Sequence, residues 1–178
     1  MRKMLSSLSL FALLFVSAAS LPAQTGPPVA PASQAFTSQE GHFRIIFAGE
    51  PKRDSQVVPL KGGGSTTLFQ FTVELDNDNI AYIVMYNDYP GDYANGDPQS
   101  VLATTRDGAV SGKTLLTDVP ITLNGVPGRA FTATDSSGLN YTVHQYLSGK
   151  RLYQLIIVGS ASHPAIQADQ FLSSFQVW

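Results

Sequence analysis

The chain has 178 residues, a length that fits one domain with a short accessory segment. Hydrophobic residues make up 43% of the sequence and charged residues only 13%, so the chain can bury an ordinary core while uncharged polar side chains cover much of the surface. There is no cysteine, which excludes disulfides and a cysteine nucleophile. The fold must therefore be held by its core alone.

The N-terminus has the pattern of a secretory signal peptide. Arg2 and Lys3 precede an apolar run, Leu8 to Val16, and small residues follow in SAASLPA. We expect a signal peptide over residues 1–23, with cleavage near Ala18–Ser20 as the alternative. The apolar run is shorter than the roughly 18 residues of a membrane anchor, and no cysteine follows it for lipid attachment. The sequence therefore predicts a periplasmic or secreted protein without stable membrane insertion after cleavage.

Removal of Arg2 and Lys3 leaves nine basic and thirteen acidic residues, a net charge near −4. This sign disfavours nucleic acid and anionic membranes as partners, because both need a basic surface. Residues 24–35, QTGPPVAPASQA, are rich in Pro and Ala without an apolar period, which predicts a linker. Residues 36–178 are expected to form a single domain.

Within that domain, short β-prone segments separated by turn residues predict an antiparallel sheet. The run Ile80–Tyr86 is almost continuously apolar, which indicates a strand buried on both faces. The other strands are expected at His42–Phe47, Lys52–Leu60, Ser65–Leu75, Leu115–Leu123 and Gly128–Asp135.

One helix is expected to begin at Asp97 and Pro98, because Asp is a good N-cap and Pro suits the first helical position. A second is expected to begin at Pro164 and to present a wide apolar stripe that ends near Phe175. The last residues, Phe175 to Trp178, are predicted to pack back onto the sheet.

Gly149-Lys150 suits a two-residue type II′ turn, with Gly at its first position. Such a turn sets Leu147 opposite Leu152 and Val143 opposite Ile156. Both faces of this hairpin then carry apolar side chains, which is typical of strands in the middle of a covered sheet.

The C-terminal pattern resembles the Mog/PsbP-like family. The resemblance rests on the run Arg151–Gly159 (RLYQLIIVG), a following helix, and Phe171-Leu172-Ser173-Ser174-Phe175. The strand HFRIIF and the segment Val126–Arg129 are similar to other parts of that family. The resemblance covers roughly residues 36–178 and implies an α+β fold, a curved antiparallel sheet with helices packed on its faces in an α/β/α-like sandwich.

Members of that family are extrinsic photosynthetic subunits, binding partners of a small GTPase, or exported bacterial proteins. They share no catalytic constellation, so the resemblance assigns no functional residue to this chain. The signal peptide favours the exported bacterial type.

No motif in the sequence predicts an enzyme, a metal site or a bound cofactor. The three histidines, His42, His144 and His163, have no metal-ligand spacing. Gly62-Gly63-Gly64 lacks the Lys and helix that should follow a phosphate loop, so it indicates a hairpin turn. A strand histidine satisfied by a neighbour is the plain interpretation of His144. An envelope hydrolase that pairs His144 with a carboxylate is the alternative.

The stretch Tyr86–Tyr93 is the segment most typical of a contact surface, because it places tyrosines among acidic residues in a predicted loop. We therefore expect a non-catalytic binding or scaffold protein of the cell envelope, with an unknown protein or small molecule as partner. Tyrosines that fold back onto the core are the structural alternative. The candidate contact residues are Tyr86, Asp88, Tyr89, Asp92 and Tyr93.

Overall fold

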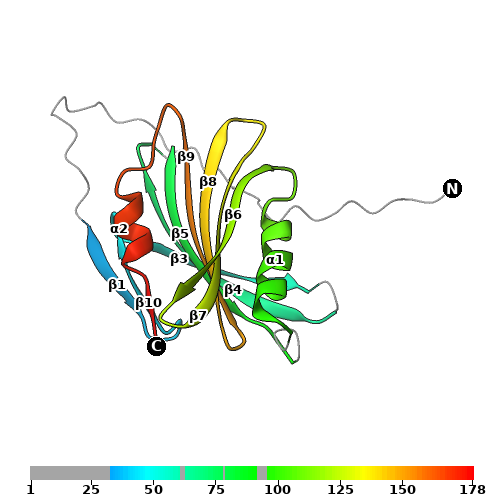
Figure 1. Cartoon of the computed structure of the whole chain (residues 1–178). Helices are drawn as coiled ribbons and strands as arrows, with labels where there is room; N and C mark the ends of the chain where they lie inside the picture. Colours follow the sequence, from blue (N-terminus) through cyan, green and yellow to red (C-terminus); the bar gives the residue numbers. More distant parts are fainter. Residues whose placement is uncertain (1–32, 61–62, 78, 92–95) are drawn as a thin grey trace. The chain divides into compact units, whose positions relative to one another are not determined.

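The computed structural model describes residues 33–60, 63–77, 79–91 and 96–178. All of these residues belong to one compact unit (Figure 1). The predicted signal peptide and the linker up to residue 32 lie outside the described residues. The first strand begins at Gln34, two residues before the predicted domain start.

The described residues form an α+β fold dominated by two antiparallel sheets. The larger sheet has seven strands in the order β3-β4-β5-β9-β8-β7-β6, and the smaller has the order β1-β2-β10. The large-sheet strands are β3 (Lys52–Pro59), β4 (Ser65–Leu75), β5 (Ile80–Asp88), β6 (Thr114–Leu123), β7 (Val126–Thr134), β8 (Leu139–Ser148) and β9 (Arg151–Ser160). The small-sheet strands are β1 (Gln34–Ser38), β2 (Phe43–Phe47) and β10 (Gln176–Val177).

Two helices, α1 (Pro98–Ala109) and α2 (Ala168–Ser173), accompany these sheets. Neither helix in the described part of the chain has the length and apolar character needed to cross a membrane. The helix start predicted at Asp97 is confirmed: the Asp97 carboxylate accepts a hydrogen bond of 2.9 Å from the backbone N–H of Ser100.

The register predicted for the β8–β9 hairpin is confirmed. Leu147 pairs with Leu152, and Val143 pairs with Ile156. Gly149 has φ 57°, the conformation that the first position of the predicted turn requires. The apolar residues of β9 are buried on both faces of the sheet: Leu155 and Ile157 pack in one cluster, and Leu152 and Ile156 pack on the opposite face.

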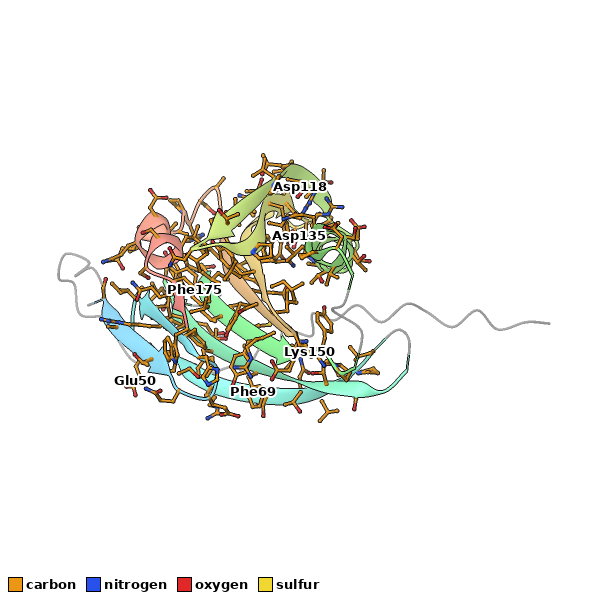
Figure 2. The ribbon with its side chains drawn as sticks, turned by 60° about the horizontal axis from the view of Figure 1, so that its bottom comes forward. Glu50, Phe69, Asp118, Asp135, Lys150 and Phe175 are labelled. Carbon is orange, nitrogen blue, oxygen red and sulfur yellow. The ribbon has the colours of Figure 1, made fainter. Side chains whose placement is uncertain are left out.

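An aromatic core fills the space between the two sheets. Phe43 of β2 is fully buried and lies within 5.5–6.3 Å of the ring centroids of Phe71, Tyr86, Tyr153 and Phe175. Figure 2 shows Phe175 beside α2, pointing into this core. Helix α2 contributes Phe171, which lies 5.4 Å from the ring of Phe47.

The opposite face of the large sheet contacts α1. Leu102 of α1 is fully buried and packs with Leu147 and Leu152. Gln145 lies on the same face with no solvent exposure, and its side-chain amide donates a hydrogen bond of 3.0 Å to Gln154. Helix α1 therefore packs on the sheet near the turn of the β8–β9 hairpin.

Three expectations about the ends of the domain differ from the structure. The small sheet is absent from the sequence-based prediction: β1 falls at the end of the predicted linker, and β10 has two residues and pairs with β2 across most of the chain. Helix α2 begins at Ala168 rather than Pro164, since Gln167 has a left-handed backbone conformation (φ 62°) that a right-handed helix cannot include. Trp178 does not pack onto the sheet: it is 60% exposed.

Candidate binding hollow beside Trp178

An open hollow of about 340 Å³ lies where the start of β2, the end of β5, the β8–β9 turn and the residue after β10 meet. We call it the Trp178 hollow. Its lining residues are His42, Asp88, Ser148, Lys150, Arg151, Tyr153 and Trp178. Most are polar or charged, and they come from four separate parts of the sequence.

Arg151 holds this region together. Its Nε and Nη2 donate hydrogen bonds of 2.6 Å to the two carboxylate oxygens of Asp88, and its Nη1 donates one of 2.8 Å to the backbone carbonyl of Glu40. The guanidinium carbon also lies 5.0 Å from the ring centroid of Tyr86. Arg151 thus joins β9, β5 and the β1–β2 turn.

The same hydrogen bonds fix the charge of Asp88. The hydrogen bond from Arg151 lowers the pKa of Asp88 below its ordinary value, against the opposing effect of partial burial. Asp88 is therefore ionised at neutral pH and neutralised by Arg151. This pair leaves the ammonium group of Lys150, at the β8–β9 turn, as a separate positive charge in the hollow (Figure 2).

The β1–β2 turn is positioned by two further contacts. The hydroxyl of Tyr153 donates a hydrogen bond of 2.7 Å to the carbonyl of Gly41. The backbone N–H of Trp178 donates one of 3.3 Å to the carbonyl of His42, which has φ 51°. This left-handed conformation lets His42 close the β1–β2 turn, and histidine is among the residue types that adopt it most readily.

Trp178 supplies the large apolar surface of the hollow. Its side chain is 60% exposed, and its ring centroid lies 6.4 Å from that of the exposed His42. The side chain of Asp88 is 57% exposed, whereas that of Arg151 is only 19% exposed. The hollow thus offers an aromatic face beside both hydrogen-bond donors and acceptors.

The predicted contact residues fall into three groups. Tyr86 is 1% exposed and stacks on Phe69 at 4.8 Å between centroids, so its predicted place in an exposed loop is wrong. Strand β5 extends to Asp88, past the predicted end at Tyr86, and Tyr86 continues the inward-facing series of Tyr82 and Val84. Asp92 and Tyr93 lie outside the described residues.

Asp88 and Tyr89 are the predicted contact residues that reach the area of the hollow. Asp88 is part of its lining. Tyr89 is half-buried against the cluster of Leu102, and its hydroxyl lies 3.3 Å from that of Thr105. The backbone N–H of Tyr89 donates a hydrogen bond of 2.9 Å to the carbonyl of Lys150, so the start of the loop is tied to the β8–β9 turn.

His144 has no carboxylate partner in the described part of the chain. Its Nδ1 lies 3.3 Å from the hydroxyl of Tyr146. Burial lowers the pKa of His144, so the imidazole is neutral at physiological pH. The hydrolase alternative required a carboxylate beside this histidine, and the described geometry does not supply one. Within residues 33–178, gaps excepted, no three His, Asp or Glu side chains gather as metal ligands.

A second charged cluster has a structural role. Asp118 of β6 accepts hydrogen bonds of 2.5 and 2.7 Å from Arg129 of β7 and also pairs with Arg106 of α1. These side chains are only 15–18% exposed. The cluster fastens α1 to the β6–β7 edge of the sheet, where Figure 2 labels Asp118.

Comparison with solved structures supports the fold. The solution structure of cyanobacterial PsbP (CyanoP) from Synechocystis sp. PCC 6803 aligns over 89% of this chain and 99% of its own, with a TM-score of 0.53 and 14% identity. The chain has a PsbP-like fold. At that identity the likeness shows the fold alone. No protein-family model and no curated protein matches the sequence.

Two other solved structures overlap less well. A protein of unknown function from Pseudomonas aeruginosa, described as a putative regulator, aligns over 73% of this chain and 84% of its own, with 9% identity and a TM-score of 0.41. A Bacteroides thetaiotaomicron VPI-5482 protein aligns over 81% of this chain and 48% of its own, with 10% identity and a TM-score of 0.36. The PsbP-like fold assigns no site, so the hollow must be interpreted from its own residues.

Proposed function

We propose that this protein is an exported, non-catalytic binding protein of the cell envelope, and that its partner binds at the Trp178 hollow. The observation that carries the proposal is the 60% exposed indole of Trp178 beside a charged hollow. Trp and Arg are the residues that most often dominate binding energy at interfaces. In this chain the other large aromatic side chains near it, Phe43, Tyr153 and Phe175, are buried.

The electrostatics of the hollow favour binding over catalysis. A general acid or base works best when its pKa lies near the working pH. The pKa of Asp88 is instead lowered, away from neutral pH, because the hydrogen bond from Arg151 stabilises its ionised form. Both groups are also held in fixed positions by their mutual hydrogen bonds. Such a pair orients a ligand but is a poor proton donor.

The loop hypothesis is retained in a narrower form. Asp88 lines the hollow and the backbone N–H of Tyr89 bonds the carbonyl of Lys150, so a partner seated on Trp178 would lie beside these two residues. Tyr86 takes no part in that surface, since its ring is buried. The proposed location, periplasmic or secreted, rests on the N-terminal signal pattern.

Retention of envelope material tests this proposal. The purified protein, produced without residues 1–23, is immobilised and exposed to a cell-envelope extract of the producing organism. The unchanged protein should retain a component of the extract, and Trp178→Ala should not. Ile166→Ala is the control: it truncates an apolar side chain that is 46% exposed outside the hollow, and it should retain the same component. Equal melting temperatures would show that both variants are folded. Unchanged retention by Trp178→Ala would refute the hollow as the binding site.

A further inference from the structure

We propose that the Trp178 hollow binds a saccharide, with one sugar ring stacked on the indole and its hydroxyls bonded by the surrounding polar side chains. This inference rests on the proposed function and assigns a ligand class to the same site. Three observations support it: the charges of the hollow, the hydrogen bonds that its backbone carbonyls already accept, and the exposure of Trp178.

The hollow offers a simple ion only one unbalanced charge, that of Lys150, because Arg151 neutralises Asp88. A single solvent-exposed ammonium group holds a small anion only weakly. A cation would meet Lys150 and Arg151. A polyhydroxylated ligand has no such conflict, because each hydroxyl both donates and accepts hydrogen bonds. Asp88 can accept from one hydroxyl while Lys150 and Ser148 bond its neighbours.

Backbone groups at the hollow are already engaged. Four carbonyls around it accept internal hydrogen bonds, those of Glu40 from Arg151, Gly41 from Tyr153, His42 from Trp178 and Lys150 from Tyr89. Strands β5 and β9 each have a partner on both sides, and the edge strand β10, which leads into Trp178, has only two residues. An extended peptide that binds by adding a strand needs free backbone groups along an edge. Recognition here therefore depends on side chains, which suits hydroxyl-bearing ligands better than a peptide main chain.

Trp178 provides an exposed aromatic ring on which the apolar face of a sugar ring can stack. A pyranose ring is polar at its rim and apolar over its C–H faces, so it gains by lying flat on an exposed aromatic ring whose neighbours are polar. The indole of Trp178 is exposed, and the hollow around it is lined mainly by polar side chains. The volume of about 340 Å³ is near the lower end of the roughly 300–1,000 Å³ range of ligand pockets. One or two sugar units of a longer chain would fit, and the chain would continue into solvent.

Trp178 is the only tryptophan in the sequence, so its fluorescence reports on this site directly. We would titrate the protein with chitotriose, cellotriose, maltotriose and trigalacturonate, and in separate arms with inorganic phosphate and trialanine. The proposal predicts a saturable change in Trp178 emission with at least one of the four sugars and none with phosphate or trialanine. Calorimetry should give the same affinity.

Substitutions sharpen the test. Lys150→Ala should weaken sugar binding about tenfold, the loss expected for one hydrogen bond to a charged group. Lys52 of β3 pairs with Glu74 of β4 and does not line the hollow, so Lys52→Ala should leave the sugar affinity unchanged. Trp178→Ala should abolish the calorimetric signal at an unchanged melting temperature.

The outcomes separate this inference from the proposed function. If none of the four sugars changes the emission while envelope retention still depends on Trp178, the saccharide inference is wrong and the binding function stands. If phosphate or trialanine binds in place of the sugars, the ligand class is wrong. If sugars bind equally well to Trp178→Ala, the site itself is wrong.

Discussion

Arg151 holds the carboxylate of Asp88 through two hydrogen bonds of 2.6 Å, one to each oxygen. This bidentate pairing joins the last residue of β5 to the first residue of β9, and both residues line the Trp178 hollow. Because Arg151 also donates to the carbonyl of Glu40, the pair fixes the β1–β2 turn against the large sheet. The shape of the hollow therefore depends on this contact.

Arg151→Ala should lower the free energy of unfolding by about 1–3 kcal/mol, because it removes charge-assisted hydrogen bonds from a side chain that is 19% exposed. Arg151→Lys should recover only part of this loss, since an ammonium group cannot bond both carboxylate oxygens in the same plane. Urea unfolding measures both effects. The exposed pair of Lys52 and Glu74 is the matched control: Lys52→Ala should change stability by less than about 0.5 kcal/mol. Equal effects at the two positions would contradict this role of Arg151.

Two glycines should respond to alanine in opposite directions. At Gly128 a Cβ atom would lie 2.6 Å from both the carbonyl oxygen of Gln145 and the ring of Tyr146, so Gly128→Ala should destabilise the fold by about 1–3 kcal/mol. At Gly108, near the end of α1, nothing lies within 4 Å of the added atom. Gly108→Ala should therefore stabilise the protein by up to about 1 kcal/mol, because alanine favours helix. Thermal unfolding of the two variants checks the signs.

Asp135 should make the protein sensitive to acid. Its carboxylate accepts hydrogen bonds from Ser137 (2.6 Å) and from the hydroxyl of Tyr141 (2.8 Å), and the contacts with Ser137 contribute most to lowering its pKa to about 2. An unfolded aspartate has a pKa near 3.9. The stabilisation is thus present above about pH 4 and is lost as the pH falls toward 2, because the unfolded state then binds the proton more tightly.

Unfolding of Asp135→Asn followed between pH 5 and pH 2 tests this linkage. The variant should be less stable than the parent at pH 5, and the difference should shrink as the pH falls. A difference that stays constant over this range would mean that Asp135 does not titrate with a lowered pKa in the folded protein.

Most strands of the large sheet and the β8–β9 hairpin could be predicted from the sequence because their signals are local, whereas the pairing of β5 with β9, more than 60 residues apart, could not. The two-residue turn at Gly149-Lys150 fixed the register of β8 against β9, and Asp97-Pro98 marked the start of α1. The small sheet could not be predicted in this way. β10 has two residues and pairs with β2 more than 130 positions earlier, so neither periodicity nor turn chemistry links them.

The candidate site shows the same limit. The hollow joins His42, Asp88, the β8–β9 turn and Trp178, which only the tertiary fold brings together. Of the residues predicted from sequence, Asp88 is part of the lining. Tyr86 was misplaced although a signal was present: it extends the period-two series of Tyr82 and Val84, which predicts an inward-facing strand residue. No sequence pattern distinguished the exposed Trp178 from a core aromatic.

Site-directed photocrosslinking in the producing cells tests the central claim most directly. A benzophenone amino acid replaces Ser148, an exposed residue that lines the hollow, or Val57, a residue of the edge strand β3 that is 70% exposed. Irradiation should yield a covalent adduct from position 148 that disappears when Trp178→Ala is added, and no comparable adduct from position 57. Equal crosslinking at both positions, or an adduct at 148 that persists without Trp178, would contradict binding at the Trp178 hollow.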